Sequence, residues 1–345
     1  MSYPYAVQLI LDCYDYLRPE EVTQRLRYST FISIPKRYMY FEVPKAACTK
    51  MKELLWRLEN GPPIQLLAGN LYETRREMFI HDRKNVPLPS LVDLDEKTQR
   101  EVLESPDFLR MTFVRNPYTR LISAWKNKVM LCEPGYEKVY AEIKGDLPPF
   151  HKKSLITFDE FVEYIATRCD LRTGNLHWRR QCDHIFYSAL NFSFVGKIER
   201  MAEGLLRFEQ HLGLPRAFVA DARNVSRGSE GEGYNTSLAD KVYSLYREDF
   251  EKFDYARDGW PARQFDSTEI GKKCAVPEEV FNDEIIERNL ILSLLYQERD
   301  QLRADMRKVS RFRLLALVNA LLAVRKLGSK SASRVKAWFR GKQQG

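Results

Sequence analysis

The 345-residue sequence has few cysteines and no long apolar run. Its six cysteines include no pair in C-x-x-C spacing, which leaves zinc ribbons and dithiol redox motifs unsupported. This pattern favours reduced thiols in a cytoplasmic protein. No apolar stretch reaches the roughly 18 residues that a membrane-spanning helix needs. We therefore expect no spanning helix in the printed chain.

Export signals and the common nucleotide-hydrolysis motif are also missing. The first 21 residues carry no basic region followed by an apolar one, so we expect neither a signal peptide nor a signal anchor. The Walker A pattern G-x-x-x-x-G-K-[ST] occurs nowhere, which argues against ATPases and GTPases. Hydrophobic residues make up 44% and charged residues 30%, which is typical of a soluble globular protein.

Positive charge is concentrated at one end of the chain. Residues 301–345 hold 12 Lys and Arg but one acidic residue, so they carry +11 while the rest carries −3 of the total +8. The nearly neutral body gives no reason to expect nucleic-acid binding. Within this tail, the apolar stretch Leu314–Val324 lies between basic clusters and suits an interfacial helix on an anionic membrane. Docking of that helix on the body, or pairing with a second chain in a homodimer, are the open alternatives.

Strand and helix patterns alternate through the first 265 residues. Short apolar runs predict strands at Arg37–Val43, Phe108–Val114 and Phe192–Val195. Because each is followed by a helix pattern, the sequence predicts an α/β domain over residues 1–265, with a parallel sheet flanked by helices. Residues 266–345 show no strand pattern and predict a helical, basic C-terminal extension.

Several helix ends carry recognisable signals. One helix is expected to stop at Asn60, which Gly61-Pro62-Pro63 follow. Another is expected to start with Asn116 as its N-cap and Pro117 at its first position. Thr157 and Glu160 form a capping box before a third, and Ser237–Phe250 has a helical apolar pattern.

The first candidate site is the turn between the first strand and its helix. Small side chains there let backbone N–H groups approach an anion, and a helix N-terminus favours negative charge. A lysine and a threonine add a cation and a hydroxyl. The alternative is an ordinary turn with a surface lysine. The residues of this turn are Pro44, Lys45, Ala46, Ala47, Cys48 and Thr49.

The second candidate site follows the second strand. Arg115 stands at the strand end, and Ser123 lies about two turns into the next helix, on the face of Asn116 and Arg120. The carboxyl edge of parallel strands is where α/β folds bind ligands, and arginine can hold a phosphate with two hydrogen bonds. The alternative is an N-capped helix with solvated arginines.

Together these motifs resemble a known family. PK-x-x-CT followed 70 residues later by R-N-P-Y-x-R-L-x-S-A-W resembles the two cofactor signatures of sulfotransferases that use 3′-phosphoadenylyl sulfate (PAPS). The branch with the chondroitin, HNK-1 and heparan 2-O carbohydrate sulfotransferases is the most similar. The resemblance covers about residues 37–256. Further matching segments are His177-Trp178, Val195–Glu199, Tyr246–Phe250 and Phe253–Tyr255.

The resemblance implies a P-loop-like core and roles for the two sites. Lys45–Thr49 would hold the 5′-phosphosulfate, with Lys45 neutralising the bridging oxygen as the nucleotide leaves. Arg115 and Ser123 would hold the 3′-phosphate. Arg227 lies in a segment that resembles the late nucleotide-contacting loop. No metal is implied, and the sequence holds no metal-ligand cluster.

Two histidines are candidates for the base that deprotonates the acceptor. His81 lies between the two signatures, where the family usually places its His or Glu base. His177 belongs to the family-like His-Trp pair, which has the alternative role of shaping the acceptor pocket. His151, His184 and His211 have only a structural interpretation. Trp178, Arg179 and Arg180 either line a sugar site or form a partly exposed loop.

The sequence thus predicts a PAPS-dependent sulfotransferase that acts on a carbohydrate hydroxyl. We expect a cytoplasmic protein, with peripheral contact to the inner face of the membrane as an option. One alternative is another nucleotide-dependent transferase or kinase. The other is a non-catalytic adaptor with a nucleotide fold at a membrane or glycan-assembly site.

Overall fold

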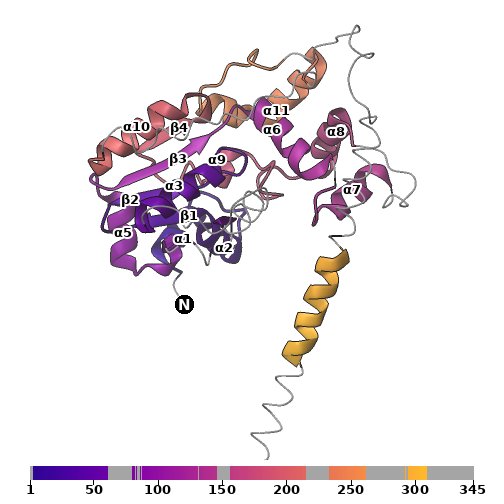
Figure 1. Cartoon of the computed structure of the whole chain (residues 1–345). Coiled ribbons are helices and arrows are strands. Elements are labelled where there is room, and N and C mark those ends of the chain that lie inside the picture. The colour runs from indigo at the N-terminus through magenta and orange to yellow at the C-terminus, as the bar shows by residue number, and fades with distance from the viewer. Residues whose placement is uncertain are drawn as a thin grey trace, which may run out of the picture.

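A computed structural model describes residues 3–60, 80, 81, 83, 86, 88–130, 132–145, 156–214, 233–261, 292 and 294–308. Its centre is a sheet of four strands in the order β1-β2-β3-β4 (Figure 1). Strands β2, β3 and β4 are parallel, whereas β1 is antiparallel to β2. The strands are β1 (Thr30–Ser33), β2 (Tyr38–Phe41), β3 (Leu109–Val114) and β4 (Phe194–Lys197).

The α/β architecture predicted from the sequence is confirmed, but the sheet is mixed rather than parallel throughout. Strand β1 was not expected. Only residues 34–37 separate it from β2, and a connection this short can join antiparallel strands but cannot cross over between parallel ones.

Alternating side chains of the sheet enter two cores. Tyr38 and Tyr40 of β2 pack with α3 (Cys48–Asn60) and α10 (Met201–Leu212) on one face. Met39 and Phe41 pack on the other face, as the two-residue period of a strand requires. The helices of that second face are α1 (Tyr5–Leu11), α2 (Pro19–Ser29) and α5 (Glu96–Glu104).

A third core belongs to helices that lie beside the sheet (Figure 1). Helix α6 continues into a π-helical turn, η3, which has Met130 as its C-cap. Short elements α9, η2 and η4 complete the body. The bounds are α6 (Pro117–Ala124), η3 (Trp125–Val129), α7 (Glu137–Lys144), α8 (Phe158–Arg168), α11 (Thr236–Lys252), α9 (Gln181–His184), η2 (Leu91–Asp93) and η4 (Ile198–Arg200).

Most predicted helix ends are confirmed. Asn116 Oδ1 accepts the backbone N–H of Tyr118 at 2.9 Å, and the capping box of Thr157 and Glu160 is present. The third predicted strand, Phe192–Val195, lies two residues later in the structure, at Phe194–Lys197, and it includes Gly196. A Cβ at Gly196 would lie 2.5 Å from the ring of Phe113, so the glycine permits close packing rather than ending the strand.

The C-terminal extension is described only in part. Residues 294–308 are helical, as expected, and stand apart from the α/β body (Figure 1). The predicted boundary near residue 265 and the apolar stretch at 314–324 lie outside the described residues. None of the helices in the described part of the chain combines the length and the apolar character needed to cross a bilayer.

Candidate active site

The turn after β2 has the backbone of an anion-binding loop. Lys45 and Ala47 both have positive φ, at 67° and 59°, a conformation that non-glycine residues rarely adopt. Such alternation of left- and right-handed residues turns successive N–H groups to one side, which forms a concave site for an anion. Helix α3 begins immediately afterwards at Cys48, so its positive N-terminus points at the same place.

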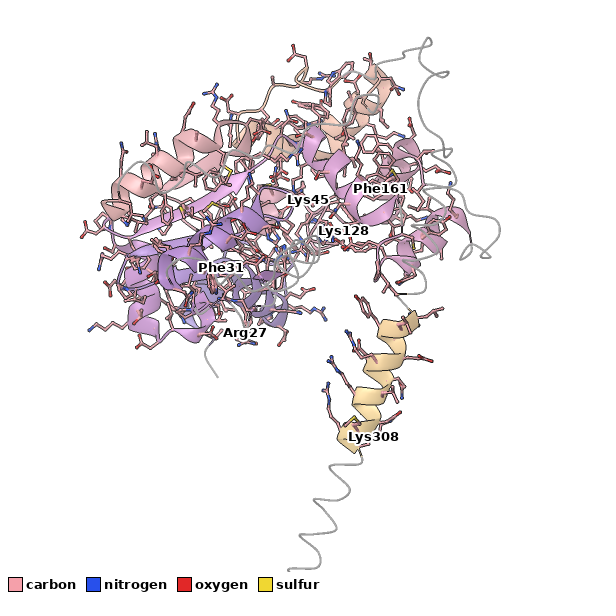
Figure 2. All side chains as sticks on the ribbon, in the orientation of Figure 1. Arg27, Phe31, Lys45, Lys128, Phe161 and Lys308 are labelled. Carbon is pink, nitrogen blue, oxygen red and sulfur yellow. The ribbon has the colours of Figure 1, made fainter. Side chains whose placement is uncertain are left out.

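Three cations converge on this turn. Burial, and then the positive charges of Lys128 and Arg115, lower the pKa of Lys45 to about 8. Figure 2 shows Lys45 and Lys128 in the middle of the body. Lys128 pairs with Glu133 at 2.5 Å, but no carboxylate of the described residues forms an ion pair with Lys45. The local excess of positive charge therefore suits a ligand with several negative charges.

Arg115 is held in place through its backbone. Gln181 accepts the N–H and donates to the carbonyl of Arg115, both at 2.8 Å. Fully buried Asp249 in turn accepts the N–H groups of Gln181 and Cys182 at 2.8 Å. The guanidinium donates to Thr119 Oγ1 at 3.0 Å. Ser123 is half-buried one turn beyond Thr119, so both hydroxyls share the face of α6 that follows Arg115.

Arg120 is a structural centre of the site. Its side chain is 2% exposed, which excludes the solvated arginine considered from the sequence. Its three nitrogens donate to backbone carbonyls: Nε to Pro44 at 3.0 Å, Nη1 to Arg179 at 2.8 Å and Nη2 to Leu176 at 3.1 Å. One side chain thus joins the anion-binding turn to the segment that carries His177.

His81 contacts the turn directly, and both of its ring nitrogens are engaged. Nε2 lies 2.9 Å from Thr49 Oγ1 and Nδ1 lies 3.1 Å from Lys52 Nζ. Burial lowers the pKa of Lys52, but Glu42 at 2.5 Å raises it overall, so Lys52 stays an ammonium and can only donate. Nδ1 of His81 therefore accepts, and its ring proton resides on Nε2.

His177 has the opposite arrangement. Its Nδ1 lies 2.7 Å from the Tyr136 hydroxyl and 3.1 Å from Asn175 Oδ1. That oxygen also accepts the backbone N–H of His177 at 2.9 Å, so the ring proton resides on Nδ1. Nε2 of His177 has no hydrogen-bond partner among the described residues, and its lone pair is available to a ligand.

Both histidines are neutral in the free protein. Burial, and then the charges of Lys52, Lys128 and Lys45, lower the pKa of His81 to about 4. Burial, followed by Lys128 and Lys45, lowers the pKa of His177 to about 2. The same cations thus face both rings, and His81 also lowers the pKa of His177. The fold therefore gathers Lys45, Arg115, His81 and His177 at one site.

The later sequence matches also meet near the site. Glu199 accepts the backbone N–H of Asn116 at 2.8 Å and the hydroxyl of Tyr255 at 3.0 Å. These two hydrogen bonds bring together the residue after β3, the segment after β4 and Tyr255, which follows α11. These contacts hold the second signature in position.

Other predicted residues have structural places or lie outside the described residues. Trp178 is 2% exposed and packs against Phe161, so its face cannot stack on a sugar, which corrects that expectation. His184 and His211 hydrogen-bond backbone carbonyls of Glu42 and Arg37, consistent with structural roles. Arg227 and His151 lie outside the described residues.

Sequence reasoning missed several members of the site. Lys128 lies in the π-helical turn η3, and no sequence pattern predicts that turn. Gln181 and Asp249 act only through partners that are distant in sequence, although Asp249 lies in a matched segment. The described residues include one set with metal-ligand proximity, Cys182, Asp183 and Glu248, but Arg180 already pairs with both carboxylates.

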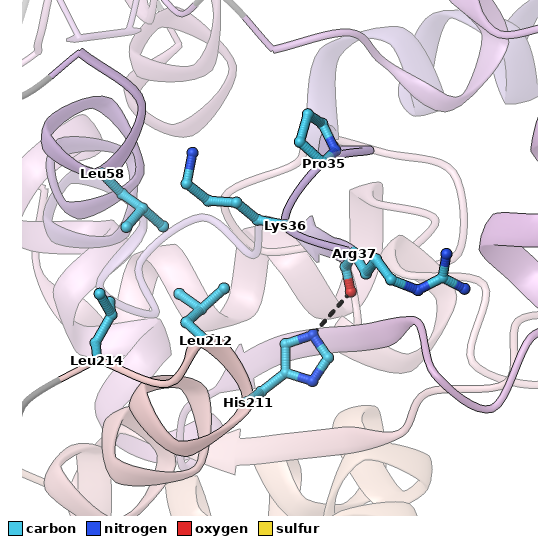
Figure 3. A pocket seen from close by; sticks show the side chains of 7 residues that line it. All are labelled: Pro35, Lys36, Arg37, Leu58, His211, Leu212 and Leu214. Carbon is cyan, nitrogen blue, oxygen red and sulfur yellow. Dashed lines mark hydrogen bonds between the residues drawn. The ribbon is translucent and has the colours of Figure 1, made fainter.

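A separate cavity of about 350 Å³ lies at the opposite edge of the sheet (Figure 3). It is lined by residues just before β2 and at the end of α10, where His211 hydrogen-bonds the carbonyl of Arg37 at 2.9 Å. Ligands of α/β folds bind beyond the carboxyl ends of the strands. This cavity is at the amino end of β2 and is not part of the candidate active site.

The sequence is similar to those of several known proteins. Human carbohydrate sulfotransferase 9 is 28% identical over 65% of this chain and 52% of its own length. Carbohydrate sulfotransferase 14 of Danio rerio is 27% identical, over 52% of this chain and 47% of that protein. Human carbohydrate sulfotransferase 8 is 24% identical, over 68% and 57%.

The chain thus spans about half the length of the curated relatives it matches. No solved structure matches it significantly. The model of the sulfotransferase family matches residues 28–256. Since that match covers more than half of the sequence and contains every residue of the described site, the chain belongs to the sulfotransferase family.

Proposed function

We propose that this protein transfers a sulfuryl group from PAPS to a hydroxyl of a carbohydrate. The observation that carries the proposal is the anion-binding turn at Lys45, surrounded by Lys128 and Arg115 without a carboxylate partner for Lys45 in the described residues. Relatives with carbohydrate sulfotransferase names support the acceptor class.

The residues fit PAPS as a substrate. The P-loop-like turn, Lys45–Thr49, would hold the 5′-phosphosulfate with backbone N–H groups and the Thr49 hydroxyl. Arg115 and Ser123 would hold the 3′-phosphate. Arg227 stays a proposal for the nucleotide-contacting loop. Small Ala46 and Ala47 leave the backbone accessible to such a ligand, since neither side chain extends beyond Cβ.

The chemistry requires charge neutralisation and a base. The donor supplies an activated sulfuryl group, whose S–O bond to the nucleotide breaks as the acceptor oxygen bonds to sulfur. Lys45 stabilises the negative charge that develops on the departing phosphate oxygen. The acceptor hydroxyl gives its proton to a neutral histidine. Negative charge on the bound donor offsets Lys128 and Lys45, which raises the pKa of that histidine toward its ordinary value.

We infer that His177 is the base and that His81 orients Thr49. His177 Nε2 carries a lone pair with no partner in the described residues, while Asn175 and Tyr136 hold Nδ1–H. His81 instead gives its Nε2 proton to Thr49, which turns the threonine hydroxyl hydrogen toward an anion. Rate–pH profiles of His177→Gln and His81→Gln separate these roles. We expect His177→Gln to remove the acidic limb of kcat, and His81→Gln to raise KM for PAPS with that limb intact. The reverse result would assign the base to His81.

Nucleotide preference tests the donor assignment. Adenosine 3′,5′-bisphosphate (PAP) at a hundredfold excess over its Kd should stabilise the fold by about 2.7 kcal/mol, which raises Tm by about 5–10 °C. AMP lacks the 3′-phosphate and should have little effect. Equal shifts with both nucleotides would overturn the assignment, and a larger shift with ATP would favour a kinase. Labelled-sulfate transfer to a panel of glycans then tests the reaction itself.

Location and assembly are separate proposals. We propose a cytoplasmic enzyme whose basic tail contacts anionic membrane. The charge of the tail and its apolar stretch support this contact. Exposed Leu294, Leu295 and Leu302 on the described part of the extension are equally suited to pairing between two copies.

A further inference from the structure

Exposed apolar side chains gather on one helix of the C-terminal extension, residues 294–308. This C-terminal helix stands apart from the α/β body (Figure 1), and Lys308 is its last described residue (Figure 2). Every leucine or methionine that is exposed among the described residues belongs to it, with exposed fractions of 53% to 72%. An isolated exposed leucine is ordinary, but such a concentration indicates a surface that another element covers. These residues are Leu294, Leu295, Leu302 and Met306.

Part of this apolar surface forms a narrow stripe with coiled-coil spacing. Steps of three and four residues alternate along the stripe, as they do at the seam between two paired helices. With about 3.6 residues per turn, the stripe covers about 80° of the helix circumference, and Leu294 lies outside it. The positions of the stripe are Leu292, Leu295, Arg299, Leu302 and Met306.

The same spacing continues in the sequence beyond the described residues. Ile285 precedes Leu292 by seven residues. At the other end, Val309 follows Leu302 by seven residues, and Arg288 is the only position of this continuation that is not apolar. The pattern thus spans about three and a half heptads, and about three to four are what a coiled-coil prediction requires.

Arg299 is the charged position of the described stripe, and it favours two strands. A polar residue at a single core position specifies register and oligomeric state, because a long side chain can leave a two-stranded seam at its edge. The guanidinium of Arg299 is already turned to one side. It lies 4.8 Å from the centre of the Tyr296 ring and 2.8 Å from the carboxylate of Asp300. Two copies of this charge can therefore stay apart in a dimer.

The two flanks of the stripe carry opposite charges. Glu298 and Asp305 lie on one flank, whereas Arg303 lies on the other. In a parallel pair, a residue of the first flank faces the residue five positions later in its partner, so Glu298 faces Arg303 of the second copy. Glu298 has no ion-pair partner among the described residues, and Arg303 is 3.9 Å from Asp300. Antiparallel pairing would place the acidic flank against another acidic flank, which is unfavourable.

The charges of the C-terminal helix fit a second copy better than an anionic membrane. Residues 294–308 hold four basic and three acidic side chains, and two of the acids flank the stripe. A helix that lies on anionic lipid is instead rich in Lys and Arg on its polar face. The proposed membrane contact therefore concerns the more basic residues that follow, and the stripe is left for a protein partner.

We propose that the C-terminal helix pairs with the same helix of a second copy as a parallel, two-stranded coiled coil. Leu295, Leu302 and Met306 lie in the seam, and Glu298 pairs with Arg303 of the second copy. Because the strands are parallel, both chains leave the coil at the same end. The two basic ends then act together, which strengthens attraction to a polyanionic surface without any new contact.

The mass of the full chain in solution tests the pairing. Sedimentation equilibrium over about 1–100 μM protein should show conversion of the 40.6 kDa chain to a species of twice that mass. Leu302→Asp puts a charge into the seam from both strands and should weaken dimerisation at least about 100-fold. Ala304→Asp adds the same charge to the opposite, exposed face of the helix and is the matched control, with no change expected. A wild-type monomer throughout the range, or equal dissociation in both variants, would overturn the proposal.

Exchange of the flank charges tests the parallel arrangement. Glu298→Arg sets like charges against each other at both flanks and should weaken the dimer by about tenfold. The further change Arg303→Glu restores opposite charges and should return the dissociation constant to within about threefold of the wild type. A dimer that Leu302→Asp disrupts but the second exchange does not restore would refute parallel pairing. Each variant should keep the melting temperature of the body. A lower value in Leu302→Asp would mean that the helix docks on its own body, which would also overturn the proposal.

Discussion

PAP binding is expected to draw a fraction of a proton onto Lys45, and the size of that fraction follows from the pKa of Lys45 in the free protein. Burial and the neighbouring cations lower the pKa of Lys45 to about 8, so about half of the free protein carries a neutral amine at pH 8. A phosphate charge about 4 Å away contributes about 4 kcal/mol at an effective dielectric of about 20. That energy raises the pKa by about 3, which restores full protonation in the complex.

Uptake should therefore be about half a proton at pH 8. Because binding requires the protonated amine, affinity should fall as pH rises through 8. Other groups contribute little at this pH. The phosphates of PAP are fully ionised at this pH. The pKa values of His81 and His177 start at about 4 and about 2, so the same upward shift leaves both below 8.

Isothermal titration calorimetry in Tris and in HEPES at pH 8 measures this uptake. The difference in observed enthalpy, divided by the difference in buffer ionisation enthalpy, gives the number of protons. Lys45→Met should abolish the uptake. Lys138→Met, on a side chain 88% exposed in α7, is the matched control and should leave it unchanged. Proton release, no uptake by the wild type, or uptake that persists in Lys45→Met would refute the reasoning.

Three further predictions test the roles of single groups. Lys45→Ala should lower kcat at saturating PAPS by about 100-fold, in addition to weakening PAP binding through loss of the same charge, whereas Arg115→Ala should weaken PAP binding at least about tenfold with little change in kcat; a larger loss of kcat in Arg115→Ala than in Lys45→Ala would contradict both roles. Arg120→Leu should lower the free energy of unfolding by about 3 kcal/mol in urea titrations, because one buried and two partly buried carbonyls lose their donor; a change within 0.5 kcal/mol, which is the ordinary range for surface substitutions, would show that these bonds are not needed. Deletion of residues 307–345 should preserve PAP stabilisation and abolish sedimentation with anionic liposomes, and retained sedimentation would exclude tail-mediated membrane contact.

Local signals in the sequence identified much of the site. The Pro44–Thr49 turn and the Asn116 cap depend on residues within a few positions of one another, so their conformation can be predicted from short-range rules. Strand β1 was missed because Thr30 follows α2 directly, with no turn residue between them. The third strand was predicted to end at Val195, before Gly196, because the close neighbour of that glycine, Phe113, is distant in sequence.

The roles of the histidines could not be ordered from sequence. Which ring nitrogen carries the proton depends on Lys52 for His81 and on Asn175 for His177. Lys52 can only donate and Asn175 Oδ1 can only accept, so each partner decides which nitrogen of its histidine carries the proton. Position between two motifs gave His81 priority, whereas the hydrogen bonds favour His177 as the proposed base.

The chain of contacts from Arg115 through Gln181 to Asp249 has a consequence for how the protein folds during synthesis. A ribosome that has delivered both signatures has not yet delivered α11, and without Asp249 the backbone of Gln181 has no buried acceptor. The turn at Lys45 and the end of β3 can meet early, but Arg115 cannot be locked until α11 docks. Contacts this distant in sequence form slowly. Nascent chains arrested before residue 249 should therefore be protease-sensitive around Arg115, and release of α11 should complete the candidate active site in one late step.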